Sequence, residues 1–359
     1  MTEKSCSICN AKILRDKYRS FFPSSLNSLV EITKASIYTC DKCGFSGVTE
    51  SIRHDRLMLY YSQYYNAKAD KAFQNSKFAR LKTKTYIFNE RYMGQLQTLS
   101  VFKALKKDTS YLEIGSGKGD LFNILIHSGL GGKFTVLEPQ NAARMILDHY
   151  DVEAIDGDIT DPNALSGQKF DVIFLSHVLE HFNPSDVKTV ITNIRKLLND
   201  DGIFLCEIPH ADLDAYPEAC ENIVPHLSFF SKKSAKLLME QCDLKVIYCE
   251  TVSLSQREKD NVSLIQAALD KGLLNAVLDE KDRMMINHYT RQRHDKISKK
   301  ERWKASIILT CATLFGITLT AKVINLIKVL NRDHEMTRLL NQSNVVREHG
   351  ENIRLLMKL

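Results

Sequence analysis

Between residues 109 and 250, short runs rich in β-branched and aromatic residues alternate with stretches of helical periodicity. The expected strands are Ser110–Ile114, Lys133–Leu137, Val152–Ile155, Phe170–Leu175, Gly202–Ile208 and Leu244–Tyr248. The helical patterns between them are Leu121–Ser128, Asn141–His149, Asp186–Leu198 and Lys232–Gln241. This alternation predicts an α/β fold in which a parallel sheet is covered by helices on both faces.

Composition allows about two domains in 359 residues, with 44% hydrophobic and 26% charged residues as in ordinary globular proteins. The net charge of +6 does not by itself require nucleic acid or membrane as a partner. The N-terminus has no apolar segment typical of a secretory signal, and five single cysteines lie in apolar runs, so we expect a cytoplasmic protein. The expected regions are 1–50 (zinc ribbon), 51–108 (helical linker), 109–250 (α/β domain) and 251–359 (helical and basic).

A glycine-rich turn follows the first expected strand, in the segment Tyr111–Asp120. Gly115, Gly117 and Gly119 let the backbone turn sharply and approach a ligand closely. Dinucleotide-binding loops have the spacing G-x-G-x-x-G, whereas this turn has G-x-G-x-G with Glu113 before it. A carboxylate there suits a ligand with an ammonium group and no phosphate, which describes S-adenosylmethionine (SAM).

Two further acids follow the next expected strands. Glu138 is placed to accept hydrogen bonds from ribose hydroxyls, and Asp158 to accept one from an adenine amino group. The alternatives are a Rossmann-like fold with tight turns and no cofactor, and a fold that binds NAD. The order of the glycines and the three acids favours SAM.

These residues resemble the class I SAM-dependent methyltransferases, over about 110–250. The segments Phe170–Pro184 and Leu197–Phe204 continue the resemblance, as a fourth strand with its helix and the turn into a fifth. The resemblance implies a Rossmann-like methyltransferase sheet and places His177 beside the cofactor. The cofactor-binding set that it implies is Glu113, Gly115, Ser116, Gly117, Gly119, Glu138, Asp158, Ile159 and His177. Two alternatives for His177, Glu180 and His181 are a helix start with solvated polar residues and a metal site, of which the metal site is the less expected.

Two Cys-x-x-Cys pairs lie near the N-terminus, Cys6 with Cys9 and Cys40 with Cys43. Four thiolates in two such pairs predict a closed, structural zinc site, and Gly44 suits the tight turn after the second pair. The competing interpretation is two redox pairs, but neither pair follows a strand and opens a helix as in thioredoxin.

A zinc ribbon before such a domain, with Tyr60–Tyr65 between them, resembles bacterial methyltransferases of sugars, nucleotide-linked sugars and cell-surface glycans. The segment Asn222–Ser231 resembles the part of those enzymes that carries a Tyr-His-Glu-His core, of which only His226 is matched. That departure weakens the case for C-methylation and leaves O-methylation open. A neutral imidazole can accept the proton of a hydroxyl group, so His226 is the first candidate base and His210 the second.

The C-terminal region contains an uncharged stretch, 305–321, directly after the basic segment Arg291–Lys304 with Trp303. Basic residues and a tryptophan beside an apolar segment are typical of a membrane interface. Three interpretations stay open: a helix at the membrane surface, a buried or self-associating helix, and a membrane span. Contact of 291–330 with the inner face of the membrane would suit a lipid-linked glycan acceptor.

A second class of function is a zinc-ribbon RNA methyltransferase or an RNA-binding protein that uses the same basic segment. The ribbon is not strongly basic, and no Asn/Asp-Pro-Pro-Tyr motif of base methylation occurs, so nucleic acid is not the expected partner. A membrane-associated scaffold without activity is a third interpretation, and the intact glycine turn argues against it.

Overall fold

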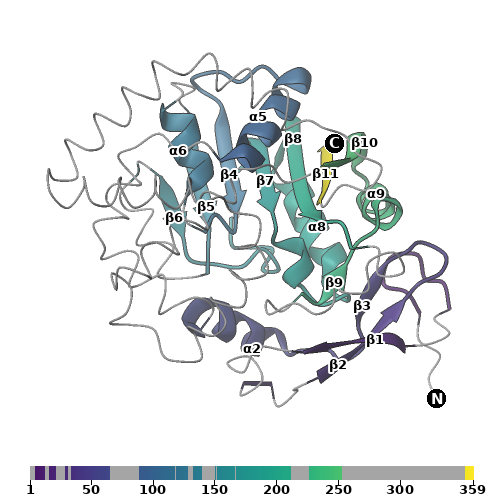
Figure 1. Ribbon diagram of the computed structural model, residues 1–359. Helices are drawn as coiled ribbons and strands as arrows, with labels where there is room; N and C mark the ends of the chain where they lie inside the picture. The colour runs from purple at the N-terminus through teal and green to yellow at the C-terminus, as the bar shows by residue number, and fades with distance from the viewer. Residues whose placement is uncertain are drawn as a thin grey trace, which may run out of the picture.

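The computed structural model describes residues 5–12, 16–21, 29–30, 34–64, 89–127, 132–139, 150, 152–211, 226–252 and 352–359, without 118 and 166. Its central feature is a seven-stranded sheet in the order β10-β11-β8-β7-β4-β5-β6 (Figure 1). Every pairing in this sheet is parallel except the two made by β11, so the predicted α/β fold is confirmed. The strands are β4 (Ser110–Ile114), β5 (Lys133–Leu137), β6 (Glu153–Ile155), β7 (Phe170–Ser176), β8 (Leu198–Pro209), β10 (Lys245–Val252) and β11 (Asn352–Lys358).

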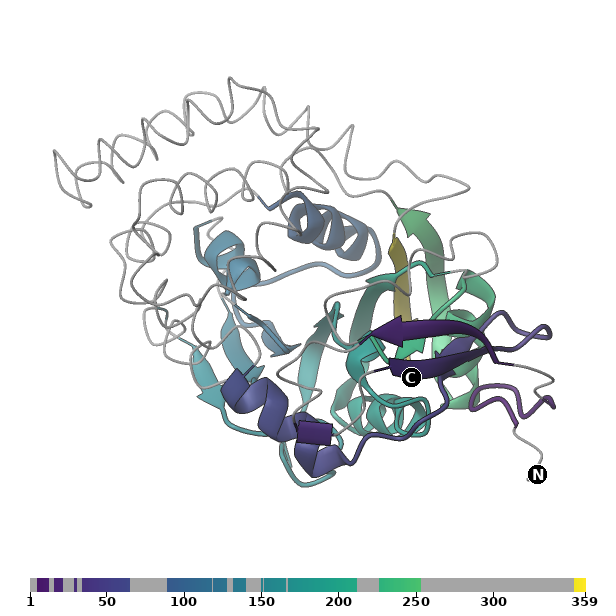
Figure 2. The same cartoon turned by 60° about the horizontal axis from the view of Figure 1, so that its bottom comes forward.

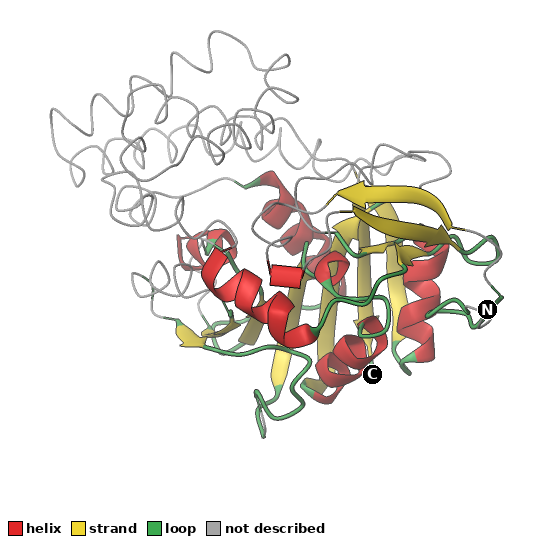
Figure 3. Ribbon diagram, turned by 90° about the horizontal axis from the view of Figure 1, so that it is seen from below, coloured by secondary structure: helices red, strands yellow, loops and turns green. Residues whose placement is uncertain are grey.

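Helices cover both faces of the sheet (Figure 3). Successive side chains of each strand point to opposite sides, and the apolar ones on both sides are buried under these helices. On one face, α5 and α6 pack over Tyr111 and Phe174. On the other face, α8 and α9 pack over Leu112 and Leu175. The helices are α5 (Glu90–Phe102), α6 (Asp120–His127), α8 (Val187–Lys196) and α9 (Lys232–Gln241).

The last strand of the sheet comes from the end of the chain. Strand β11 lies between β10 and β8, where Asn352 is the partner of Val252 on one side and of Pro209 on the other. The predicted boundary at residue 250 is therefore wrong, because 352–358 belong to the sheet. Seven residues are too few for periodicity to separate a strand from a helix, and the pairing partners of 352–358 lie far away in the sequence.

The N-terminal region forms a second sheet, in the order β1-β2-β3-β9. Its first three strands come from the cysteine-containing region, whereas β9 comes from the α/β domain. Strand β3 pairs with β9 through Ser46 with Phe229 and Gly47 with Ser228. Figure 2 brings the purple N-terminal strands to the front of the green and yellow strands. The strands are β1 (Asp16–Phe21), β2 (Lys34–Thr39), β3 (Ser46–Val48) and β9 (Ser228–Phe229).

Side chains strengthen this junction between the two sheets. The hydroxyl of Ser231 donates to the carbonyl oxygen of Cys43 at 2.9 Å, and Ser231 also caps α9. The rings of Phe45 and Phe230 have their centroids 5.2 Å apart. The cysteine region therefore shares one hydrophobic core with the α/β domain.

Part of the expected linker 51–108 is helical in the structure, as α2 (His54–Leu59), the π-helical turn η1 (Tyr60–Tyr64) and α5. None of the helices in the described ranges is long and apolar enough to cross a membrane. The expected helix Asn141–His149 and the segments 291–330 and 305–321 lie outside the described residues.

Candidate active site

The glycine turn joins β4 to α6 at the carboxyl edge of the parallel strands. Gly115, Gly117 and Gly119 have φ values of 72°, 55° and 71°, which favour glycine. A Cβ atom on Gly115 would lie 2.5 Å from a methyl group of Val178, so the turn packs closely against the segment after β7. A Cβ atom on Gly117 would meet no described residue within 4 Å, which leaves room for a ligand beside this part of the turn.

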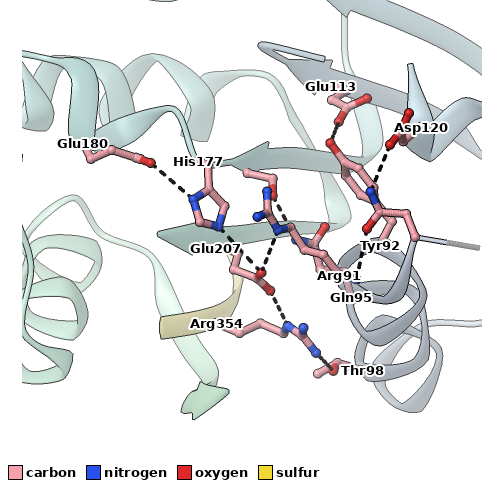
Figure 4. A network of polar contacts seen from close by, with 12 residues as sticks. Arg91, Tyr92, Gln95, Thr98, Glu113, Asp120, His177, Glu180, Glu207 and Arg354 are labelled. Atoms are coloured by element: carbon pink, nitrogen blue, oxygen red, sulfur yellow. Dashed lines mark hydrogen bonds and ion pairs between the residues drawn. The ribbon is translucent and has the colours of Figure 1, made fainter. Parts of the chain in front are cut away.

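Glu113 lies under this turn and is 1% exposed. One carboxyl oxygen accepts a hydrogen bond from the hydroxyl of Tyr92 at 3.0 Å, and the other has no hydrogen-bond partner among the described residues (Figure 4). Burial raises the pKa of Glu113 to about 8, against the effect of the Tyr92 hydrogen bond. A buried carboxyl group with an unused oxygen fits a ligand that brings a positive charge.

Glu138 follows β5 and is 5% exposed. Its carboxylate accepts the backbone N–H of Gly117 at 3.1 Å. Ser116 is buried as well, and its hydroxyl has no hydrogen-bond partner in the described part of the chain. The turn thus combines a fixed carboxylate with a buried hydroxyl, which together fit a polar ligand.

Asp158 and Ile159 lie in the loop after β6. The carboxylate of Asp158 accepts hydrogen bonds from the backbone N–H and the hydroxyl of Thr160, and it forms an ion pair with His54 of α2. Burial acts to raise the pKa of Asp158, but these hydrogen bonds outweigh it and lower the pKa. The carbonyl oxygen of Ile159 accepts from Asn193 at 2.9 Å. The contact with adenine stays a prediction for Asp158.

His177 follows β7 and has a φ of 55°, a conformation that costs a residue with a Cβ atom about 1–2 kcal/mol. Its Nδ1 lies 3.5 Å from a carboxyl oxygen of Glu180, and its Nε2 lies 4.0 Å from one of Glu207 (Figure 4). Its backbone N–H donates to the carbonyl oxygen of Glu207 at 2.8 Å. Strained residues of this kind cluster at functional sites, and the place of His177 beside the cofactor stays a prediction.

A buried ion-pair network extends from Glu207 to the end of the chain. Glu207 and Arg354 are 1% and 2% exposed as side chains, and they are joined by a hydrogen bond of 2.7 Å. Arg354 also donates to the hydroxyl of Thr98 at 3.0 Å, and Nε of Arg91 lies 3.8 Å from Glu207. The network therefore links β8, β11 and α5 under the carboxyl edge of the sheet.

His226 lies beside the short helix η2 (Leu179–His181), because the next residue, Leu227, donates its N–H to the carbonyl oxygen of Glu180 at 2.8 Å. The rings of His226 and His181 have their centroids 5.0 Å apart. Burial, together with the charge of His181, lowers the pKa of His226 well below 6.5. His226 is therefore a neutral imidazole at neutral pH. His210, the second candidate base, follows β8 and forms a β-bridge with Phe230.

The four N-terminal cysteines converge in space, and their sulfur atoms all lie within 4.8 Å of one another. The closest pairs are Cys6 with Cys43 at 3.6 Å and Cys9 with Cys40 at 3.5 Å. Thiolates around a tetrahedral zinc ion, with Zn–S bonds of about 2.3 Å, lie about 3.8 Å apart. Asn10 and Gly44, which follow the two pairs, have φ values of 58° and 73°. The donor set fits a tetrahedral metal site.

The sequence did not point to several of these residues. Tyr92 and Arg354 contact acids that lie far away along the chain, so no local spacing connects them. His54 likewise meets Asp158 only because α2 lies against the loop after β6. Glu180 was expected either at a helix start with solvated polar residues or at a metal site with His177 and His181, and the structure buries it at 2% exposed.

The family model described as "Methyltransferase domain" matches residues 65–248 of the chain. A search of curated proteins found no match. Similar solved structures include a complex of the Haloferax volcanii Trm112 methyltransferase activator with a methyltransferase (15% identity; 57% of this chain and 83% of that chain; TM-score 0.41). Another is a SAM-dependent methyltransferase from Archaeoglobus fulgidus (10% identity; 75% and 94%; TM-score 0.39). A third comes from Clostridium acetobutylicum (12% identity; 47% and 86%; TM-score 0.38). From the family match and the sheet described above, the chain belongs to the methyltransferase domain family and is a SAM-dependent methyltransferase.

Proposed function

We propose that this enzyme transfers a methyl group from SAM to a sugar or a cell-surface glycan precursor, with His226 as the general base. The observation that carries the proposal is a half-buried, neutral imidazole next to the segment that packs on the glycine turn. The acceptor classes are a sugar, a nucleotide-linked sugar and a lipid-linked glycan. O-methylation suits the chemistry of a single imidazole base, and C-methylation is the alternative at the same site.

The chain's own residues suit the cofactor. Glu113 would hold the ammonium group, and Gly117 leaves space for the methionine part. Glu138 would bind the ribose and Asp158 the adenine, with Ser116, Ile159 and His177 around them. When bound, SAM supplies a methyl group on a positively charged sulfur. That sulfur is a good leaving group, because it becomes a neutral thioether when the methyl group is transferred.

The enzyme must then orient the acceptor and take one proton from it. A sugar hydroxyl is too weakly acidic to ionise at neutral pH, so a base that accepts its proton during transfer lowers the barrier. His226 is already neutral at that pH, so its ring nitrogen is ready to accept. His210 is the second candidate for the same task.

We further propose that Cys6, Cys9, Cys40 and Cys43 hold one structural zinc ion. Four protein ligands leave no open position for a substrate, so the ion would stabilise the N-terminal sheet without doing chemistry.

A membrane-facing role for 291–330 is also part of the proposal. Val252 and Asn352, the residues that flank 253–351, are partners at the end of β10, beside Pro209. This is the carboxyl edge of the sheet, where ligands bind in such folds. Residues 291–330 lie outside the described residues, and the proposed contact rests on their basic and apolar sequence.

The deciding experiment incubates the protein with methyl-labelled SAM and separate fractions of sugars, nucleotide sugars, lipid-linked glycans and RNA. Label in a glycan fraction supports the proposal, whereas label in RNA alone establishes the alternative of a zinc-ribbon RNA methyltransferase.

With the labelled fraction as substrate, His226→Ala should lower turnover by about 10²–10⁴ with unchanged SAM affinity. His210→Ala should lower it less. Wild-type turnover in His226→Ala would rule out this base.

A further inference from the structure

A second group of metal-ligating side chains lies apart from the cysteines, at the carboxyl edge of the sheet. Glu180, His181 and His226 each offer one ligand atom, and these atoms all lie within 4.8 Å of one another. Two of the residues are neighbours in η2, and the third is held there by the hydrogen bond from Leu227 to the carbonyl oxygen of Glu180. The backbone therefore fixes the spacing of the three groups.

Glu180 is the unusual member of this group. It is 2% exposed, and neither carboxyl oxygen has a hydrogen-bond partner among the described residues. The nearest base, Nδ1 of His177, lies 3.5 Å from one of these oxygens and outside hydrogen-bond geometry. A buried carboxyl group in this state is costly unless a cation or a donor satisfies it.

The chemistry of the donors selects the cation. Two imidazole nitrogens with one carboxylate suit divalent transition metals such as Zn²⁺, whereas Mg²⁺ and Ca²⁺ prefer oxygen ligands. Three protein ligands also leave open positions, unlike the four cysteines. His177 could orient the carboxylate of Glu180 through its Nδ1, as residues that contact metal ligands commonly do.

We propose that Glu180, His181 and His226 form a second cation site, which binds a divalent transition-metal ion and thereby blocks the proposed base. A ring nitrogen of His226 that donates its lone pair to a metal cannot accept a proton from the acceptor. Binding of the ion does not depend on the proposed function, but its inhibitory effect rests on the role of His226 as the base.

The test titrates Zn²⁺ calorimetrically into full-length protein that already holds one equivalent of zinc, without SAM or acceptor. The expected result is one further ion per chain. Glu180→Gln and His181→Ala should weaken this binding at least tenfold, whereas the matched change Glu240→Gln, on the half-exposed surface of α9, should not. Failure to bind a second ion, or wild-type affinity in Glu180→Gln, overturns the site.

Glu180→Gln should fold, because burial raises the pKa of Glu180 to about 8, and glutamine resembles the protonated carboxyl group in size and charge. His181→Ala gives an independent second variant.

In the activity assay, the second equivalent of Zn²⁺ should inhibit the wild type, and a weak chelator should restore turnover. Stoichiometric binding of the second ion with unchanged turnover would overturn the blocking role while the site itself stands.

Discussion

Glu113 and Glu180 are buried carboxyl groups at the candidate site, and burial raises the pKa of each to about 8. In the folded, ligand-free protein both therefore keep a proton at neutral pH, whereas in the unfolded chain both ionise above their ordinary pKa of 4.5. The unfolded chain binds fewer protons in this window, so the stability of the ligand-free protein should fall as the pH rises from about 4.5 to 8. A bound ligand with a positive charge favours the ionised carboxylates and so acts against this loss of stability.

SAM binding should release a proton from Glu113, because the ammonium group favours the ionised carboxylate. Calorimetry at pH 6.5 in two buffers of different ionisation enthalpy should show nearly one proton released for each SAM bound. Between pH 5 and 7 the affinity should rise by up to about tenfold for each pH unit. In Glu113→Gln the proton release should disappear and SAM should bind more weakly. Binding by the wild type without proton release would contradict the role given to Glu113.

Gly117→Val should abolish SAM binding, because the side chain would fill the open space beside the turn. Gly167→Val is the matched control. Gly167 also has a positive φ, 80°, and open space around its Cβ position, but it lies before β7, away from the carboxyl edge. Both variants should lose about 1–2 kcal/mol of stability, since both strain the backbone, but only the first should lose SAM affinity in calorimetry. Equal loss in both would point to a global effect.

At the scale of the elements, β11 connects β10 to the rest of the sheet. It supplies Arg354 to the buried carboxylate of Glu207, and its apolar residues Leu355 and Leu356 pack on opposite faces. The strand that joins β10 to β8 in the sheet is therefore separated from β10 in the sequence by residues 253–351.

Arg354→Met should destabilise the protein by about 3–5 kcal/mol, because it leaves a buried carboxylate without its main partner. Lys358→Met, near the end of the same strand, is the control and should change stability by less than about 0.5 kcal/mol. Urea unfolding measures both. In the double variant Arg354→Met/Glu207→Gln, part of the stability should return, since the buried carboxylate that lost its main partner is then removed. A single variant as stable as the wild type would mean that Arg91 is a sufficient partner for Glu207.

At the scale of the whole molecule, the N-terminal cysteine region and the α/β domain share the sheet that contains β9 and a common hydrophobic core. Two hydrogen bonds between Ile52 and the side chain of Asn183 add to the same junction. The two regions should therefore unfold together.

Replacement of Cys40 and Cys43 by serine should remove the proposed zinc ion and lower the stability of the entire chain. Scanning calorimetry of the wild type should show one transition, shifted to lower temperature by the replacement or by a strong chelator. Zinc analysis before and after chelation is the control. Two separate transitions, with the larger one insensitive to chelator, would show that the N-terminal region is an independent domain.

Membrane contact is best tested without removing β11. Deleting 291–359 would take Arg354 out of the sheet, whereas replacing 256–348 by a short turn keeps β10 and β11 and joins strand ends that are already partners. The shortened protein should stay in the supernatant with anionic liposomes at low salt, while the full chain should pellet. SAM affinity should be nearly unchanged. A full chain that ignores these liposomes would favour the buried or self-associating helix.

The sequence by itself determined the features that are local. Runs of β-branched and aromatic residues predicted β4 and β5 at their observed bounds and β6 and β7 to within one residue. Strand β8 begins four residues before its predicted start, and β10 ends four residues after its predicted end. The glycine turn with Glu113, and the two cysteine pairs, were also readable because the residues involved lie close together or at fixed spacing.

Only the tertiary structure decided which distant groups meet. It joined Arg354 to Glu207, Tyr92 to Glu113 and β3 to β9, and it brought His226 beside His181. These contacts depend on burial and on pairing between segments far apart in the chain, and neither leaves a periodic signal in the sequence. The same burial raises the pKa of Glu180 and lowers that of His226, so the protonation states at the candidate site follow from the fold and not from residue type.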